Sequence, residues 1–458
     1  MIKNEYNKNI IANKLKSDFK NEESNELNFS NLVDRYAIKT GKNACIIDTY
    51  RDELYCMSFT DFTKSYSNLK QEFYHRRGVE TEYASKTFLE SDDTKRFSDV
   101  VFNPKGDHLE NEFNMFTGFY YPNKGQKIED NKVSIIINLL DTLTNDRFGT
   151  EYILNWTSHS LQKPWERPET NIFFLGNQGT GKSIFCEYLL SKLFKKYHKT
   201  LSDSSVFEGS WNDELIGKLM IYLDEAVYSG DKKVANRVKN FTTGKTLNVK
   251  KKFFDSFEMN NYARIIGSSN NVNIAAVEKL DRRNVIFRTS DENIGNREYF
   301  NNVIKFIDEN IDLIFNYFMN RDISNFNTRD IPYTEVKDEV RKENLEVHEE
   351  FLIELVDKLS DKEIETYLDK EKIIKNDNLL YVEKHYLYQQ YLTFAKVVRP
   401  SKYKHETKNK FTSIFEECFG REVSVSKRLS DGEVHRCFVF NYDSIKDKVM
   451  NHLKINNI

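Results

Sequence analysis

Apolar residues recur along the chain with a spacing that changes from region to region. In "VSIIINLLDTLT" and "TEYILNWTSHSLQ" (133–162) they recur every three or four positions, which predicts a pair of helices ending near Gln162. The stretch that follows holds short apolar runs separated by polar segments, which predicts buried strands alternating with helices. From Arg297, helical spacing returns in "REYFNNVIKFIDENIDLIFNYFM" and again in "TEVKDEVRKENLEVHEEFLIELVDKL" (334–359), and each predicts one long amphipathic helix. The chain is therefore expected to belong to the α/β class.

Alternating apolar and polar residues predict hairpins near both ends of the chain. "NACIIDTYRDELYCMSF" (43–59) has two β-prone runs around the polar turn "YRDE". In "REVSVSKRLSDGEVHRCFVF" (421–440), two alternating runs flank the Asp431-Gly432 turn, and helical patterns precede them. Helices followed by a hairpin favour a winged-helix-like DNA-binding domain. The expected order is a mixed α/β amino-terminal domain (1–130), a core (131–325), a helical connector (326–380) and the winged-helix-like domain (381–458).

Composition narrows the function classes. The net charge of −3 over 458 residues means that any binding of a polyanion depends on local patches. The five cysteines are odd in number and form no CxxC pair, which is typical of reduced thiols and offers no zinc framework. The amino terminus is too charged for a secretory signal, and no apolar run is long enough to cross a bilayer. We expect a soluble cytoplasmic protein without a membrane partner, in the host cytoplasm if the chain is viral.

A glycine-rich stretch, "FFLGNQGTGKSIF" (173–185), is the strongest chemical signal. It fits G-x-x-x-x-G-K-[ST] between an apolar strand pattern and an amphipathic helix pattern, which is the context that a phosphate-binding loop requires. In such a loop the glycines let backbone N–H groups surround phosphate oxygens, Lys182 neutralises charge, and the Ser183 hydroxyl can ligate Mg²⁺. A plain glycine-rich turn is the weaker explanation. The predicted ATP-binding residues are Gly176, Asn177, Gln178, Gly179, Thr180, Gly181, Lys182 and Ser183.

In three later segments, polar side chains stand directly at the end or the start of an apolar run. "KLMIYLDEA" (218–226) ends in Asp224, which would hold Mg²⁺ through water, and Glu225, which would polarise the attacking water. "YARIIGSSNN" (262–271) places Asn270 where it could contact the γ-phosphate or align that water, although a polar strand exit explains Asn270 equally well. In "KLDRRNVIFRTS", Arg282 or Arg283 could stabilise charge on the transferred phosphoryl group, or pair with Asp281 at the surface.

The phosphate-binding loop is followed, at short spacings, by "MIYLDEA", "IIGSSN" and "LDRRN". This order of motifs resembles the superfamily 3 helicases of the phage, plasmid and poxvirus type. The segments "VFNPKGDHLENEFNMFTGFYYP" and "NRVKNFTTGKTLNVKKKF" are also similar, so the resemblance covers residues 100–340. It implies a P-loop AAA+ ATPase core that assembles into a ring, as a homo-hexamer.

The resemblance also implies a DNA-binding hairpin between the second and third strands. "TLNVKKKFF" occupies that place, so Lys250, Lys251 and Lys252 would contact DNA phosphates and Phe253 would stack on a base. Phe253 stands where some members have histidine, so a hydrogen bond from this position is excluded; without the other motifs, "KKK" would be read as a solvated turn. Members often carry a primase domain, but only roughly 100 residues precede the similarity. Asp48 in "IIDTY" lacks the paired carboxylates of a two-metal site, so we expect no priming activity.

The leading hypothesis is an ATP- and Mg²⁺-dependent DNA helicase of a phage or mobile element. It would translocate on single-stranded DNA at forks, with a separate primase or polymerase as a possible partner. A non-unwinding AAA+ ATPase, such as an initiator, loader or packaging motor, shares every nucleotide motif and is the alternative. A small-molecule kinase is disfavoured because the chain offers "LNVKKKF" and a terminal hairpin where a kinase needs an arginine-bearing lid.

Overall fold

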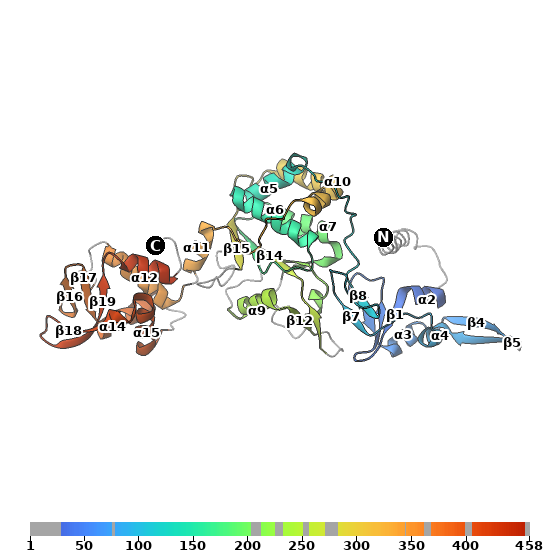
Figure 1. Cartoon of the computed structure of the whole chain (residues 1–458), viewed down its shortest axis with the longest axis horizontal. Coiled ribbons are helices and arrows are strands. Elements are labelled where there is room, and N and C mark those ends of the chain that lie inside the picture. The colour runs from blue at the N-terminus through green and yellow to red at the C-terminus, as the bar shows by residue number, and fades with distance from the viewer. Residues whose placement is uncertain are drawn as a thin grey trace. The chain divides into compact units, whose positions relative to one another are not determined.

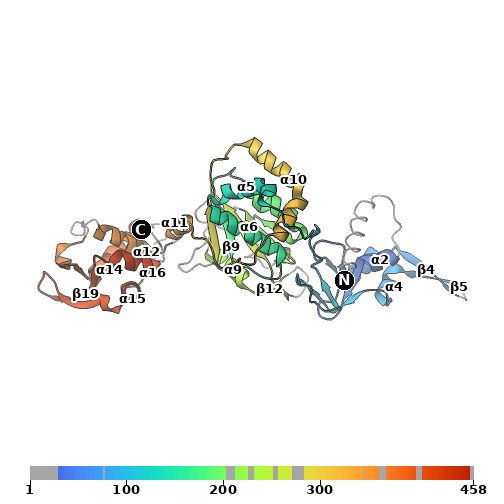
Figure 2. The same ribbon diagram turned by 45° about the horizontal axis from the view of Figure 1, so that its top comes forward.

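The computed structural model describes residues 29–75, 78–202, 212–224, 232–250, 256–270, 283–343, 345–360, 368–398 and 405–453. The chain divides into two compact units, Met1–Asn270 with Thr289–Ile331, and Asn271–Arg288 with Pro332–Ile458. Their elements are labelled in Figure 1 and seen from a second direction in Figure 2. Among the described residues, no helix combines the length and the apolar character needed to cross a bilayer.

The amino-terminal part of the first unit is a small mixed structure with its own core. A four-stranded sheet in the order β3-β2-β1-β6 packs with short helices around Leu32, Tyr36, Phe62 and Phe88. Strand β2 pairs antiparallel with β3, so the hairpin expected around "YRDE" is confirmed. The elements are α2 (Phe29–Arg35), β1 (Tyr36–Lys39), β2 (Cys45–Asp48), β3 (Cys56–Met57), α3 (Phe59–Ser65), β4 (Lys70–His75), β5 (Gly78–Tyr83), α4 (Ala84–Glu90), β6 (Arg96–Phe97), β7 (Asp99–Val101) and β8 (Glu112–Asn114).

A parallel sheet forms the centre, with the strand order β10-β11-β14-β9-β15. All five residues of β9 are buried, as is usual for a parallel strand covered on both faces. The strands of this sheet alternate with helices along the chain, so the predicted alternation is confirmed. The elements are η1 (Asp130–Val133), α5 (Ser134–Thr144), α6 (Arg147–Gln162), β9 (Asn171–Leu175), the π-helical η2 (Ile184–Leu189), α7 (Leu190–Phe194), η3 (Lys195–Tyr197), β10 (His198–Leu201), η4 (Asp213–Leu215), β11 (Met220–Asp224), α9 (Lys232–Thr243), β12 (Thr246–Val249), β13 (Phe257–Asn260), β14 (Arg264–Ser269), β15 (Asn284–Arg288) and α10 (Arg297–Asn320).

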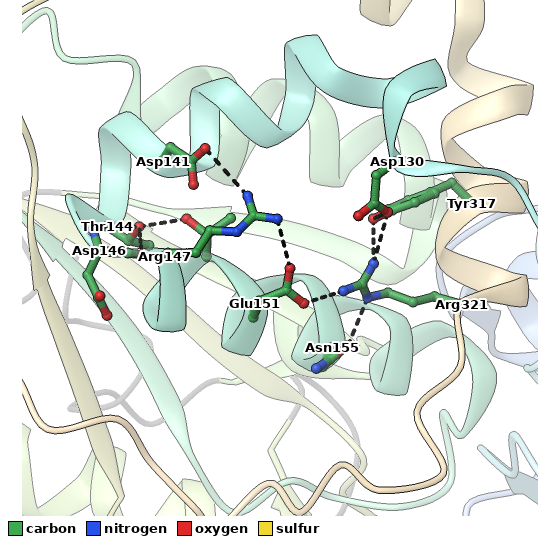
Figure 3. A network of polar contacts seen from close by, with 10 residues as sticks. Asp130, Asp141, Thr144, Asp146, Arg147, Glu151, Asn155, Tyr317 and Arg321 are labelled. Carbon is green, nitrogen blue, oxygen red and sulfur yellow. Dashed lines mark hydrogen bonds and ion pairs between the residues drawn. The ribbon is translucent and has the colours of Figure 1, made fainter.

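Helices α5, α6 and α10 appear where the spacing of apolar residues predicted them, and they pack on one another. A polar network fastens the end of α10 to α6 (Figure 3). The Arg321 guanidinium donates to Asn155 Oδ1 at 2.8 Å and forms ion pairs with Asp130 and Glu151. Glu151 also accepts from Arg147 at 3.2 Å. The helices beside the sheet are thus held by charges as well as by apolar contacts.

The second unit has a four-stranded antiparallel sheet in the order β16-β17-β19-β18. Strands β18 and β19 pair across the Asp431-Gly432 turn, which confirms the predicted terminal hairpin. One hydrophobic core runs from Leu345 to Leu453 and joins this sheet to its helices. Besides β15, the elements are α11 (Glu335–Glu343), α12 (Val347–Ser360), η6 (Lys370–Lys372), β16 (Ile373–Asn376), β17 (Leu379–Glu383), α14 (Lys384–Val398), α15 (Lys408–Phe419), η8 (Arg421–Val423), β18 (Ser424–Arg428), β19 (Val434–Asn441) and α16 (Ile445–Leu453).

Two expectations for this unit are wrong. The single helix expected over 334–359 is two helices, because a new helix start interrupts it: the Glu346 N–H donates to the Glu349 carboxylate at 3.0 Å, and the Glu346 carbonyl accepts from the Glu349 N–H at 2.8 Å. The expected helical connector (326–380) also contains β16, and its boundary falls inside β17. The turn between these strands places Asp377 at φ +50°, a conformation that Asp tolerates, so the Asn376-Asp377-Asn378 stretch is a turn signal that the prediction did not use.

Candidate functional site

The loop after β9 has glycines where a side chain would collide with its surroundings. A Cβ atom on Gly176 would lie 1.9 Å from Thr289 Oγ1. Gly181 has φ +97°, and a Cβ there would lie 2.9 Å from Phe300 Cε1 and 3.0 Å from Leu139 Cδ1. The helix begins directly after this loop, so the predicted order of strand, glycine loop and helix is confirmed. These glycines let the loop lie close against α5 and α10.

Lys182 points its ammonium group into the loop. Its side chain is only 6% exposed, and Nζ donates to the carbonyls of Gly176 at 2.7 Å and Asn177 at 2.6 Å. Nζ also donates to Asn270 Oδ1 at 3.1 Å, although the two residues are 88 positions apart. The sequence predicted these residues from separate stretches, and the fold brings them together at the centre of the loop.

The strand order explains why these groups converge. Strand β14 lies between β9 and β11, and all three are parallel, with Ser269 beside Leu175 and Ser268 beside Asp224. The carboxyl ends of parallel strands meet at one edge of the sheet, where open α/β sheets bind ligands. Asp224 and Asn270 therefore reach the same edge as the loop.

A tyrosine that the sequence analysis did not single out positions Asp224. The Tyr222 hydroxyl donates to Asp224 Oδ1 at 3.0 Å and lies 2.6 Å from Ser268 Oγ. Burial is the main cause that raises the pKa of the Tyr222 hydroxyl, so it stays protonated and able to donate at neutral pH. Tyr222 is two residues before Asp224 on a strand, hence on the same face, and this spacing is the signal that could have found it.

The loop and the strand ends border a cavity of about 400 Å³, large enough for a small ligand. Lys182, Ser183 and Asp224 line it, together with Ser268 and Phe300. A serine hydroxyl and a carboxylate are hard oxygen donors, the type that Mg²⁺ prefers, so these residues fit the expected metal. The cavity combines a cationic group, oxygen ligands and a helix start, which suits a phosphorylated ligand.

A second contact missed by the sequence analysis lies at the rim of the loop. Asn177 Nδ2 donates to Asp291 Oδ2 at 2.8 Å. The Thr289 hydroxyl donates to Thr180 Oγ1 at 3.2 Å, and Thr180 is fully buried. The segment before α10 therefore supports the loop from outside, through residues more than a hundred positions along the chain.

Several predicted site residues lie outside the described residues, namely Glu225, Lys251, Lys252, Phe253 and Arg282. Arg283 is described as the half-buried residue before β15, in the second unit. The hairpin expected between the second and third strands is present, since β12 and β13 pair antiparallel from Thr246 to Asn260. Asn212 braces it: Asn212 Oδ1 accepts from the N–H of the exposed Lys250 at 2.8 Å, and its own N–H donates to the Lys250 carbonyl at 3.2 Å.

Asp48, the carboxylate of the amino-terminal sheet, is engaged in an ion pair. Its side chain is buried, and both oxygens accept from the Arg35 guanidinium at 2.7–3.2 Å. Arg51 Nε lies 3.3 Å from the same carboxylate. Asp48 therefore organises two arginines in this part of the chain.

Comparison with known proteins finds sequence similarity to a phage protein and to a family model. Residues 174–283 match a family of unknown function (DUF5906). The "DNA Primase-polymerase" of Nitratiruptor phage NrS-1 is 25% identical over 253 residues, which are 53% of this chain and 34% of that protein. The chain thus matches about a third of the length of this relative.

Solved structures of the NrS-1 C-terminal region have a similar fold. One apo structure gives a TM-score of 0.63 at 17% identity and covers 89% of this chain and 96% of that chain. An A-form apo structure gives a TM-score of 0.59 at 19% identity, with coverages of 81% and 93%. At these identities the similarity shows the fold, and it extends over most of both chains.

Proposed function

We propose that this chain is an ATP-dependent DNA helicase that serves DNA replication in a phage. The observation that carries the proposal is the convergence of Lys182 and Asp224 on one cavity at the carboxyl edge of a parallel sheet, where Asn270 accepts a hydrogen bond from Lys182. The similarity to a phage protein named for primase and polymerase activity supports a role in replication. The hairpin β12–β13, in which Lys250 directly follows β12 and two further lysines come next in the sequence, supports action on DNA.

The residues of the site have distinct roles in this proposal. Lys182 exchanges its carbonyl partners for phosphate oxygens and neutralises their charge. Ser183 and Asp224 would hold Mg²⁺, which when bound neutralises charge that develops on the phosphates. Tyr222 fixes the orientation of Asp224 by its hydrogen bond. Glu225 activates the attacking water and Asn270 aligns it.

The assembly proposed is a ring, a homo-hexamer, in which Arg282 or Arg283 completes the site of a neighbouring subunit. Single-stranded DNA would contact Lys250, Lys251, Lys252 and Phe253, and the second unit would bind duplex DNA at a fork. We assign no priming activity to this chain. Asp48, the carboxylate considered for such a site, is held by Arg35 in an ion pair.

The test is to measure ATP hydrolysis with Mg²⁺, with and without single-stranded DNA, and strand displacement on a forked substrate. Lys182→Ala should lose nucleotide affinity by at least about tenfold, and Glu225→Gln should bind ATP without hydrolysing it. Lys305→Ala is the matched control, because Lys305 is an exposed lysine on α10 that pairs only with Glu309, one turn along the same helix, among the described residues. Hydrolysis without strand displacement would favour the non-unwinding motor, and an inactive wild-type protein would refute both.

A further inference from the structure

Two arginines lie at the opposite end of β14 from the nucleotide site. Arg264, the first residue of β14, is 1% exposed, and among the described residues its guanidinium donates to main-chain carbonyls. The acceptors on the segment between α6 and β9 are the carbonyls of Lys163 at 3.0 Å, Pro164 at 3.4 Å and Glu166 at 2.6 Å. The guanidinium therefore ties this segment to the start of β14.

Arg167, on the same segment, binds the base of the β12–β13 hairpin. Its guanidinium donates to the carbonyl of Gly244, two residues before β12, and to that of Phe241 at 3.5 Å. Asn261, which follows β13, donates to the same two carbonyls, at 2.8 Å to Phe241 and 3.3 Å to Gly244. Both ends of the hairpin thus meet at these acceptors.

The arrangement is electrostatically unfavourable. The pKa of the Arg264 guanidinium is lowered to about 9, mainly by burial and also by the charge of Arg167. Burial also lowers the pKa of Arg167. Buried charges are often replaceable by apolar residues without loss of stability, so two of them at one place call for an explanation other than stability. A planar guanidinium can bind several carbonyls in fixed directions, which a lysine or an apolar side chain cannot.

We propose that Arg167 and Arg264 form a clamp that fixes the hairpin base to β14 and so couples the hairpin to the nucleotide site. Strand β14 is buried along its whole length and ends beside Asn270, which contacts Lys182. Asn270 is six positions after Arg264, roughly 20 Å at the rise of a strand. A shift of Asn270 on hydrolysis would move β14, and the clamp would transmit that movement to the DNA-binding hairpin. The coupling rests on the proposed function, whereas the clamp itself does not.

The experiment compares wild type with Arg167→Lys and Arg264→Lys in the full-length protein. Amide hydrogen exchange in β12 and β13 should become about tenfold faster in both variants, with exchange in β9 unchanged. Basal ATP hydrolysis should stay within about twofold of wild type, while its stimulation by single-stranded DNA falls about fivefold. Arg329→Lys is the control, since the exposed Arg329 pairs with Glu169 near the same segment and should change neither readout.

Each outcome decides one part of the proposal. Unchanged exchange in β12 and β13 would show that the arginines do not hold the hairpin. Faster exchange with full DNA stimulation would reject the coupling. If Arg264→Lys fails to fold, Arg167→Lys tests the same clamp from its less buried member. If wild-type protein hydrolyses no ATP, the proposed function and the coupling both fail, and the exchange data still decide whether the clamp exists.

Discussion

At the residue scale, Gly181 and Gly295 differ in what surrounds them. Gly181 has a positive φ, as does Gly295, but nothing lies within 4 Å of a Cβ on Gly295. Gly181→Ala should therefore lower the free energy of unfolding by about 2 kcal/mol more than Gly295→Ala, because both incur backbone strain and only the first collides with Phe300 and Leu139. Urea denaturation of the two variants measures the difference. Equal losses would mean that the loop can move away from α10 freely.

The half-buried His198 predicts how stability depends on pH. Burial lowers the pKa of His198 to about 4, from an ordinary value of 6.5, although its Nε2 lies 3.1 Å from the Cys186 carbonyl oxygen. The unfolded state therefore binds more protons between pH 6.5 and 4, so stability falls as the pH drops through this window. At pH 5 the loss due to this histidine is about 2 kcal/mol.

His198→Gln should remove that part of the pH dependence between pH 7 and 5, because glutamine keeps a hydrogen-bonding side chain and does not titrate. The chain's three tryptophans all fall in the first unit, so their fluorescence follows its denaturation. The exposed His108 supplies the control variant, His108→Gln, whose pH profile should match wild type. An unaltered slope in His198→Gln would show that His198 is not buried in its neutral form.

The sequence located Lys182, Asp224 and Asn270 because motif glycines and strand ends leave a local signal. The sequence patterns used for the prediction did not point to Tyr222 or Asp291. A tyrosine inside an apolar run reads as a core residue, and Asp291 reaches the loop only through folding of a segment 114 positions away. Contacts of this kind depend on strand order, which periodicity does not determine.

At the element scale, the spacing of apolar residues predicted strands and helices of the first unit well. It failed to predict the break between α11 and α12, which a single polar side chain produces. Helix α6 follows the Asp146 cap and ends at Gln162, where its end was expected. The break between α11 and α12 depends instead on one carboxylate, Glu349, which bonds back to a backbone N–H. A glutamate in a charged helix face gives no hint of that role.

The hairpin β12–β13 carries the next prediction. Lys251→Ala/Lys252→Ala should leave basal ATP hydrolysis near its wild-type value, because β12 and β13 form a separate two-stranded sheet from the one that holds Asp224 and Asn270. The change should abolish strand displacement and DNA stimulation, and reduce the salt dependence of single-strand binding by about one counterion per lysine. Titrations of labelled single-stranded DNA over a salt series measure this slope. A variant that still unwinds a fork at the wild-type rate would remove the hairpin from the mechanism.

At the scale of the whole molecule, the second unit has one core that includes α12, β17 and α16, so it is a domain in its own right. The sequence predicted its last hairpin and a separate terminal domain, but placed the boundary within β17. The winged-helix resemblance and duplex binding remain predictions. Similarity to the NrS-1 C-terminal region across 89% of this chain shows that the combination of these units recurs in another protein.

The last prediction concerns the sharing of sites between subunits. Arg282 and Arg283 directly precede β15, and the proposed ring would place one of them in the site of a neighbouring subunit. Protein with Arg282→Ala/Arg283→Ala and protein with Lys182→Ala should each be inactive alone. When the two are mixed, about one interface in four joins an intact loop to intact arginines, because each heterologous interface takes one half of its site from each subunit. ATP hydrolysis should recover toward a quarter of the wild-type rate.

The control for this mixing experiment is a protein that carries all three substitutions. Mixed with either single-defect protein, it offers no complete interface, so hydrolysis should stay at background. Mass measurement of single particles establishes that rings containing both proteins have formed. If such rings show no recovery in the first mixture, the arginines act within their own subunit or not at all, and the ring would then need another source for the charge that stabilises phosphoryl transfer.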